Sequence, residues 1–97
     1  MINPTNLPVR YDLITQPERR LVRLEYIERQ NNLCHHCHCP LDEDPCEEVM
    51  TARITESRFP AGFFHHPIHL HHNKKTGYTI GAVHARCNAY LFQYHDE

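Results

Sequence analysis

The clearest hydrophobic periodicity in the chain lies between residues 17 and 32. Apolar residues recur there at helical spacing, and a proline occupies the first helical position with an acidic residue beside it. The pattern predicts an amphipathic helix that ends at Asn31 and Asn32, because asparagine tolerates left-handed backbone geometry. Its basic side chains are expected to face solvent: Arg19, Arg20 and Arg23.

Two short β-prone segments, residues 67–72 and 78–83, flank a turn sequence that contains a glycine. Glycine supplies the positive φ that a hairpin loop needs, so these segments predict two antiparallel strands. Successive side chains of an extended strand point to opposite faces. His71 and His72 can therefore flank one bound group only if the strand bends or the group lies at its end.

The remaining segments carry weaker patterns. Residues 84–95 repeat tyrosine and leucine near helical spacing and predict a C-terminal helix. Residues 1–16 contain prolines without a sustained period, which predicts an N-terminal arm. Residues 41–64 form an acidic insertion, within which Val49–Thr55 predicts a short strand. The insertion also holds an aromatic patch: Phe59, Phe63 and Phe64.

Length and composition narrow the class of protein. The chain has 97 residues, of which 40% are hydrophobic and 23% charged, so it is expected to form one soluble domain over residues 1–97 rather than a disordered chain. No run of about 18 apolar residues is present, which argues against a membrane partner. The N-terminus lacks the apolar region of a secretory signal, and we therefore expect a cytoplasmic protein.

The charge distribution gives no general argument for nucleic-acid binding. The formal net charge is −2, whereas proteins that bind polyanions usually carry a basic balance. Six acidic residues fall within residues 41–64, and five arginines fall within residues 1–40. Basic character is therefore local.

Cysteine and histidine are abundant, with five and ten copies. In a reducing cytoplasm metal ligation is favoured over disulfides, and metal bonds can replace part of a thin core. Cys34 and Cys37 form a C-x2-C pair, and His84 and Cys87 form an H-x2-C pair at the predicted helix start, where positions i and i+3 share a face. These four residues predict a structural Zn²⁺ site.

The cluster at residues 34–39 leaves other ligand sets open. A site that used Cys39 or Cys46 would change the register, and a tract this rich in histidine and cysteine can also bind metal without a defined fold. We expect Cys39 and Cys46 to lie outside the site. The remaining histidines of the cluster are expected to face solvent or to support the ligands: His35, His36 and His38. The overall prediction is a small zinc-stabilised α+β domain with an N-terminal helix, a zinc knuckle, a β-hairpin and a C-terminal helix.

The chain resembles the HNH, or His-Me finger, nucleases, and most closely their phage endonuclease VII-like branch. The resemblance spans roughly residues 18–95, with residues 41–64 unaccounted for, and it implies a ββα-metal fold and an endonuclease. It is carried, together with Cys34 and Cys37, by His69-Leu70-His71-His72, Thr76-Gly77, Gly81 and His84-Ala85-Arg86-Cys87-Asn88.

The resemblance implies that His72 is the general base and that His71 and Asn88 bind a catalytic Mg²⁺, Mn²⁺ or similar divalent cation. The sequence departs from the family pattern at two positions. His84 stands where the family has a cysteine, which preserves zinc ligation. His71 stands where the family has a metal-binding aspartate, which shifts the expected preference toward nitrogen-tolerant ions. The middle asparagine of the HNH motif has no clear counterpart.

The resulting expectation is a metal-dependent endonuclease that hydrolyses DNA phosphodiester bonds, in a bacterial host cytoplasm if phage-encoded and with a possible homodimer as its working form. The alternative is a non-catalytic zinc-binding module that recognises nucleic acid or a protein, and net acidity favours it. A third possibility is metal scavenging by surface histidines. The expected nucleic-acid contacts are Lys74, Lys75, Arg86 and His69.

Overall fold

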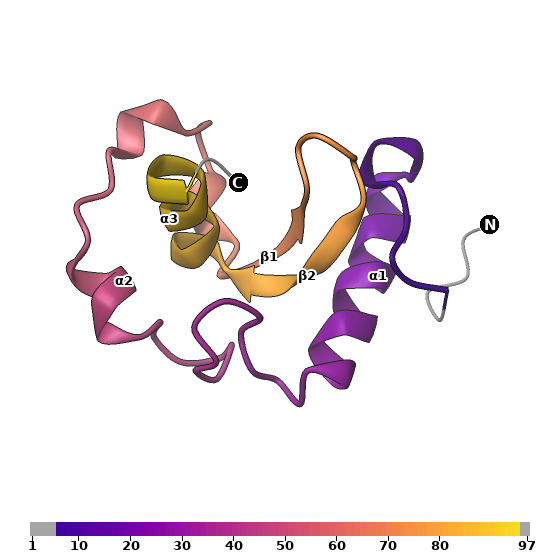
Figure 1. The fold of residues 1–97 in the computed structure, drawn as a ribbon, viewed down its shortest axis with the longest axis horizontal. Helices are drawn as coiled ribbons and strands as arrows, with labels where there is room; N and C mark the ends of the chain where they lie inside the picture. Colours follow the sequence, from indigo (N-terminus) through magenta and orange to yellow (C-terminus); the bar gives the residue numbers. More distant parts are fainter. Residues whose placement is uncertain (1–5, 96–97) are drawn as a thin grey trace.

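Two helices flank a β-hairpin in the computed structural model, which describes residues 6–95 (Figure 1). Helix α1 (Gln16–Arg29) lies on one side of antiparallel strands β1 (Ile68–His72) and β2 (Thr79–His84), and helix α3 (Ala85–His95) lies on the other. The prediction of a small α+β fold is therefore confirmed. The shorter elements are helix α2 (Glu47–Thr51) and single 3₁₀ turns at Tyr11–Leu13, Glu56–Arg58 and Phe63–His65.

Helix α1 begins at Gln16, one residue before the predicted start, because Thr15 and Glu18 form a capping box. Each side chain accepts a hydrogen bond from the other residue's backbone N–H. The helix ends as predicted, since Asn31 and Asn32 adopt φ of 55° and 60°.

The buried side of α1 differs from the predicted apolar stripe. Leu21 and Leu24 are 47% and 50% exposed, whereas Val22 is fully buried. Arg19, expected in solvent, is only half-exposed and donates to the Tyr11 carbonyl from Nε and Nη2. The helix is turned so that Arg19 and Val22 face the rest of the molecule, because the N-terminal segment and the hairpin pack there.

The hairpin matches its prediction to within one residue at each end. Gly77 closes the loop with φ of 80°, the left-handed geometry that the turn requires. A register shift lies between His71, which pairs with Gly81, and His72, which pairs with Thr79. The extra residue is Ile80, so the β-bulge lies on β2 and not on the strand that carries the histidines. The predicted helical position of His84 is wrong, because His84 is the last residue of β2.

The N-terminal segment lies against the hairpin rather than forming a separate arm. Tyr11 donates its backbone N–H to the Gly77 carbonyl at 2.7 Å, and Thr79 donates its backbone N–H to the Val9 carbonyl at 2.8 Å. Residues 1–5 of the predicted arm lie outside the described residues. The segment that follows them is tied to the loop end of the hairpin by backbone hydrogen bonds.

The predicted strand at Val49–Thr55 is wrong, since this stretch begins inside α2. Acidic residues occupy the first turn of α2, where the helix dipole favours negative charge, and Val49 is fully buried. At the other end Arg86 donates to the carbonyls of Val49, Met50 and Ala52. This side chain from α3 satisfies carbonyl groups that the short helix leaves without intrahelical partners.

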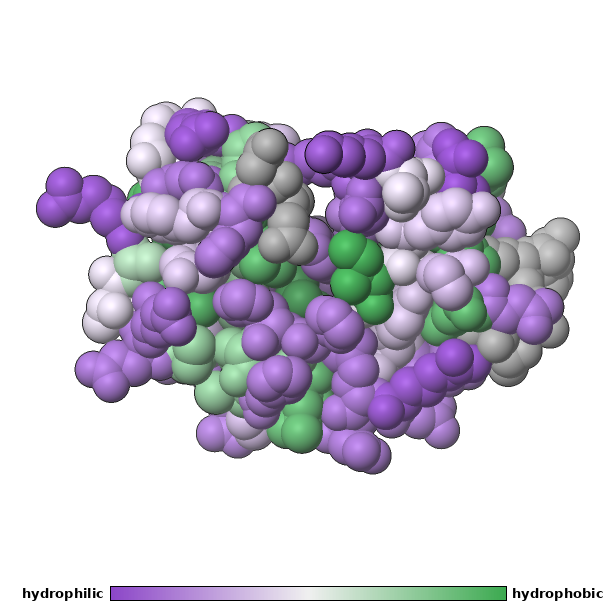
Figure 2. Space-filling model, viewed as in Figure 1, coloured by the Kyte–Doolittle hydropathy of each residue, from purple (hydrophilic) through white to green (hydrophobic). Residues whose placement is uncertain are grey.

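The core is small and includes two cysteines. Hydrophilic residues cover most of the face seen in Figure 2, where hydrophobic residues appear in small separate patches. Within residues 6–95, no helix is both long enough and apolar enough to cross a bilayer. The central cluster of buried residues comprises Cys34, Leu41, Val49, Ala82, Val83 and Cys87.

Gln30 pairs with the outer edge of β2 through its side chain. Its Nε2 donates to the Ala82 carbonyl and its Oε1 accepts from the Ala82 N–H, both at 2.9 Å. Gln30→Ala removes the hydrogen-bond partner of the Ala82 N–H and one of the two donors to the Ala82 carbonyl, which keeps the His35 N–H at 3.0 Å. We expect it to lower the free energy of unfolding by about 1 to 3 kcal/mol in urea denaturation. Gln93 is the matched control, because it makes the same pair of bonds to Thr55 and Arg53 at an exposed position. Equal losses for Gln30→Ala and Gln93→Ala would show that burial at β2 is not the cause.

Candidate functional site

Four metal-binding side chains meet between the loop after α1 and the end of β2. One ligand atom from each of Cys34, Cys37, His84 and Cys87 lies within 4.8 Å of the other three. Zinc–thiolate bonds of about 2.3 Å in a tetrahedron place neighbouring sulfurs roughly 3.8 Å apart, so the separations suit a closed site. The structure therefore brings together all four residues predicted from their spacing, and they can hold zinc.

The orientation of His84 fits metal binding. Its Nε2 lies 2.8 Å from the Pro40 carbonyl oxygen, which can only accept, so the ring proton is on Nε2. Nδ1 then carries a lone pair, and it lies 3.5 Å from both the Cys37 and Cys87 sulfurs. A backbone carbonyl that fixes the histidine tautomer is the usual support for a zinc ligand.

One sulfur of this cluster, that of Cys34, is favoured as a thiolate, whereas burial raises the pKa of Cys37. The Cys87 thiol and the backbone N–H groups of His36 and Cys37 lower the pKa of the Cys34 thiol well below its usual value. The same contact raises the pKa of Cys87, because its proton is held by the Cys34 thiolate. One thiolate is therefore favoured in the metal-free cluster, and zinc would deprotonate the remaining ligands.

The alternative ligand registers are not favoured by the geometry. Cys39 and Cys46 are half-buried free cysteines outside the four-residue group, and no second group of this kind forms among residues 6–95. His35 and His38 are exposed and His36 is half-exposed. The burial of Cys34 and Cys87 in the core connects the metal site directly to folding.

A second concentration of polar side chains lies at the other end of the hairpin. His71, His72 and Asn88 line one cavity of about 240 Å³ together with Lys74. His71 and His72 are the last two residues of β1, so the cavity lies at the end of this strand, and Asn88 comes from the first turn of α3. The other residues around it are Arg58, Phe59, Pro60, Phe63 and Phe92.

His72 is held in place by the N-terminal segment. The Tyr11 ring stacks on the imidazole with centroids 3.9 Å apart and planes 5° from parallel. On Tyr11 lies Arg19, with Cζ 3.8 Å from the ring centroid. Burial, followed by the charge of Arg19, lowers the pKa of His72 and so favours the neutral ring at neutral pH.

His69 orients Asn88. His69 Nε2 lies 2.8 Å from the Phe63 carbonyl oxygen and must donate to it, which leaves Nδ1 as an acceptor for the Asn88 amide Nδ2 at 3.1 Å. Burial lowers the pKa of His69 and favours this neutral form. With its nitrogen held by His69, Asn88 turns its Oδ1 away from that ring and keeps it available as a ligand.

The predicted phosphate contacts have different surroundings. Lys74 lines the cavity, and Lys75 is exposed in the hairpin loop. Arg86 does not line this cavity, because its guanidinium holds the end of α2. His69 is occupied by Phe63 and Asn88, which gives it a supporting position rather than a free donor.

The contacts around His72 were not predicted from the sequence. Tyr11 stacks on His72 and Arg19 lies on Tyr11, and no local pattern indicates contacts between segments so far apart in the chain. Phe59 and Phe63 belong to the aromatic patch noted in the sequence, but their position opposite the histidines depends on the fold.

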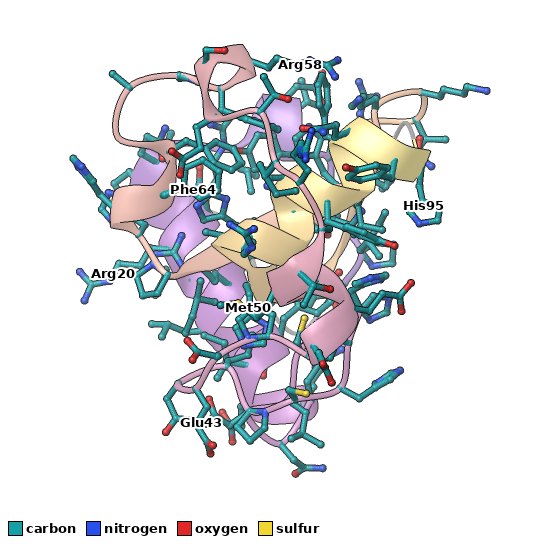
Figure 3. All side chains as sticks on the ribbon, turned by 90° about the vertical axis from the view of Figure 1, so that its left-hand side faces the viewer. Arg20, Glu43, Met50, Arg58, Phe64 and His95 are labelled. Carbon is teal, nitrogen blue, oxygen red and sulfur yellow. The ribbon has the colours of Figure 1, made fainter. Side chains whose placement is uncertain are left out.

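A larger cavity, of about 930 Å³, lies beside the zinc-ligand cluster and is bordered by Asp42, Glu43 and Asp44. These acidic residues would repel phosphate. Figure 3 places Glu43 at one end of the molecule and Arg58 at the opposite end, so the smaller cavity is the better candidate for an anionic ligand.

Comparison of the chain with protein-family models, curated protein sequences and solved structures finds no match.

Proposed function

We propose that this chain is a metal-dependent endonuclease of the HNH type that hydrolyses DNA phosphodiester bonds. The observation that carries the proposal is the convergence of His71, His72 and Asn88 on one cavity. These are the residues to which the sequence resemblance gives the base and the cation ligands. A zinc scaffold alone has no chemical need for such a group at a separate site.

In this proposal His72 is the general base. The neutral imidazole takes a proton from a water molecule, the water oxygen attacks phosphorus, and the bond to the 3′ oxygen breaks, with a solvent proton completing the leaving hydroxyl. The lowered pKa of His72 keeps the ring neutral at neutral pH, and stacking on Tyr11 limits its rotation. Both effects favour a base that is ready before substrate binds.

His71 and Asn88 would hold the divalent cation. His71 is 3% exposed and borders the cavity, and the Asn88 Oδ1 is turned away from His69. When bound, Mg²⁺ or Mn²⁺ would neutralise charge on the phosphate and on the leaving oxygen. The nitrogen ligand from His71 suits Mn²⁺ better than Mg²⁺.

The proposed zinc ion is structural. Cys34 and Cys37 lie before the hairpin, His84 ends β2, and Cys87 lies in α3. Zinc held by these residues would fix the hairpin and the following helix as a ββα-metal unit, with His72 on the hairpin and Asn88 on the helix. In support, the ligand atoms of the Cys34–Cys37 pair and of the His84–Cys87 pair all lie within 4.8 Å of one another.

The test is plasmid nicking by the zinc-loaded chain with and without added Mg²⁺ or Mn²⁺. We expect cleavage only with added cation, and Asn88→Ala is expected to lower the rate on the order of 100-fold at fixed cation concentration. Gln93→Ala is the control, because Gln93 lies on the same helix outside the cavity and should leave the rate unchanged.

Absence of cleavage by the folded, zinc-loaded parent on every DNA form would contradict the proposal. That result would support the non-catalytic zinc-binding module, which the net charge of −2 favours.

A further inference from the structure

The cavity that holds the three candidate catalytic residues has an aromatic wall, formed by Phe59, Phe63 and Phe92. The Phe59 ring contacts the other two, with centroid distances of 4.8 Å to Phe63 and 5.6 Å to Phe92. All three rings are half-buried, so part of each remains accessible. Aromatic surface opposite a hydrolytic site is unnecessary for the chemistry and points to recognition of the substrate.

Two cationic side chains lie at this wall. Lys74 Nζ is 3.7 Å from the Phe92 centroid, and Arg58 Cζ is 5.5 Å from it. Aromatic rings combined with positive charge are the recognition elements of single-stranded nucleic-acid sites, where bases stack on rings and cations contact the backbone. The aromatic wall therefore suits the base of a nucleotide, and the two cations suit its phosphate.

The wall is fixed relative to the candidate catalytic residues. Gly62 adopts φ of 82°, which allows the turn that places Phe59 beside Phe63. The Phe63 carbonyl accepts the hydrogen bond from His69, and the Phe63 ring packs edge-on against the same histidine at 4.6 Å. His69 in turn orients Asn88. A base on the wall would therefore lie beside the proposed cation ligand.

The size of the cavity limits what can enter. Its volume of about 240 Å³ is below the roughly 300 to 1,000 Å³ of sites for drug-sized ligands, so it suits the base of one nucleotide, with the phosphates outside. Bases within a duplex are stacked and paired, and an enzyme pocket reaches them only when they are unpaired or flipped out.

We propose that this cavity takes an unpaired nucleotide next to the scissile phosphate, so that the chain cuts single-stranded or locally unpaired DNA in preference to a continuous duplex. The proposal rests on the proposed nuclease function and specifies its substrate. Phe59 and Phe63, whose ring planes are 35° apart, stack the base, and Arg58 and Lys74, which lie at the Phe92 ring, contact the neighbouring phosphates.

The test compares cleavage of one labelled strand in three forms: alone, in a continuous duplex, and in a duplex with an unpaired bulge. We expect the parent to cut the unpaired and bulged forms at least 10-fold faster than the duplex. Phe59→Leu keeps apolar volume but removes the flat ring, and we expect it to slow cleavage of unpaired DNA about 5- to 100-fold. Phe59→Trp should retain the preference.

Phe64→Leu is the matched control, because Phe64 contacts the same aromatic cluster but borders the other cavity. Equal cleavage of all three DNA forms, or equal slowing by Phe59→Leu and Phe64→Leu, would overturn the inference and leave the nuclease proposal intact.

Binding separates the two proposals further. Fluorescence anisotropy of a labelled single strand with His72→Ala, which should not cut, is expected to show 5- to 100-fold weaker binding when Phe59→Leu is added. Unchanged binding would overturn the nucleotide site. Weakened binding without cleavage by the parent would support the site while contradicting the nuclease.

Discussion

Cys34→Ser is expected to abolish stoichiometric zinc binding and with it the folded state. Structural zinc sites contribute about 10 to 16 kcal/mol of apparent binding free energy in small domains, whereas a whole domain is stable by about 5 to 15 kcal/mol. Cys34 is both a candidate ligand and part of a small core. Metal analysis and circular dichroism of the purified variant measure the two losses.

Cys39→Ser is the control for this prediction, because Cys39 lies in the same loop and outside the ligand group. It should retain one zinc per chain and the folded spectrum. Chelation should unfold the parent, and added Zn²⁺ should refold it. Zinc retained at full stoichiometry in Cys34→Ser would show that another ligand set is used.

His72→Ala is expected to lower metal-dependent DNA cleavage by about 100- to 10,000-fold, the usual contribution of a general base. Its fold and zinc content should remain, because His72 is half-buried at the end of β1, away from the zinc ligands. The measurement is the single-turnover rate with saturating Mn²⁺.

His95→Ala provides the comparison for His72→Ala, since His95 is an exposed histidine at the end of α3 (Figure 3). It should cut at the parental rate. Full activity in folded His72→Ala, free of contaminating nuclease, would remove His72 from the mechanism.

Local sequence signals predicted the hairpin, both long helices and the four zinc-ligand candidates. Each of these signals lies within a short stretch of sequence. The hairpin shows alternation around a glycine, the helices show helical periodicity, and the metal cluster shows a C-x2-C and an H-x2-C pair. The pairs meet because α1 and β2 lie side by side, and Gln30 joins the end of α1 to Ala82.

Features that depend on distant contacts were mispredicted or not predicted at all. Val49 and its neighbours have β propensity, but burial and the Arg86 hydrogen bonds favour a helix. The stack of Tyr11 on His72 joins residues 61 positions apart, and periodicity cannot indicate such a pair. Phe59 was visible as an aromatic residue, but only the fold puts it across from His71.

The stretch from residue 38 to residue 67 follows the candidate zinc ligand Cys37 and ends just before β1, and it supplies one wall of the cavity without supplying any candidate catalytic residue. Lengthening a connection whose ends are anchored adds little entropic cost. Exposed parts of this stretch can therefore vary in length, provided that Leu41 and Val49 stay in the core and that the Phe63 carbonyl keeps its bond to His69. If the proposed function holds, substitutions in the wall that this stretch supplies would change which substrate is recognised without changing a candidate catalytic residue.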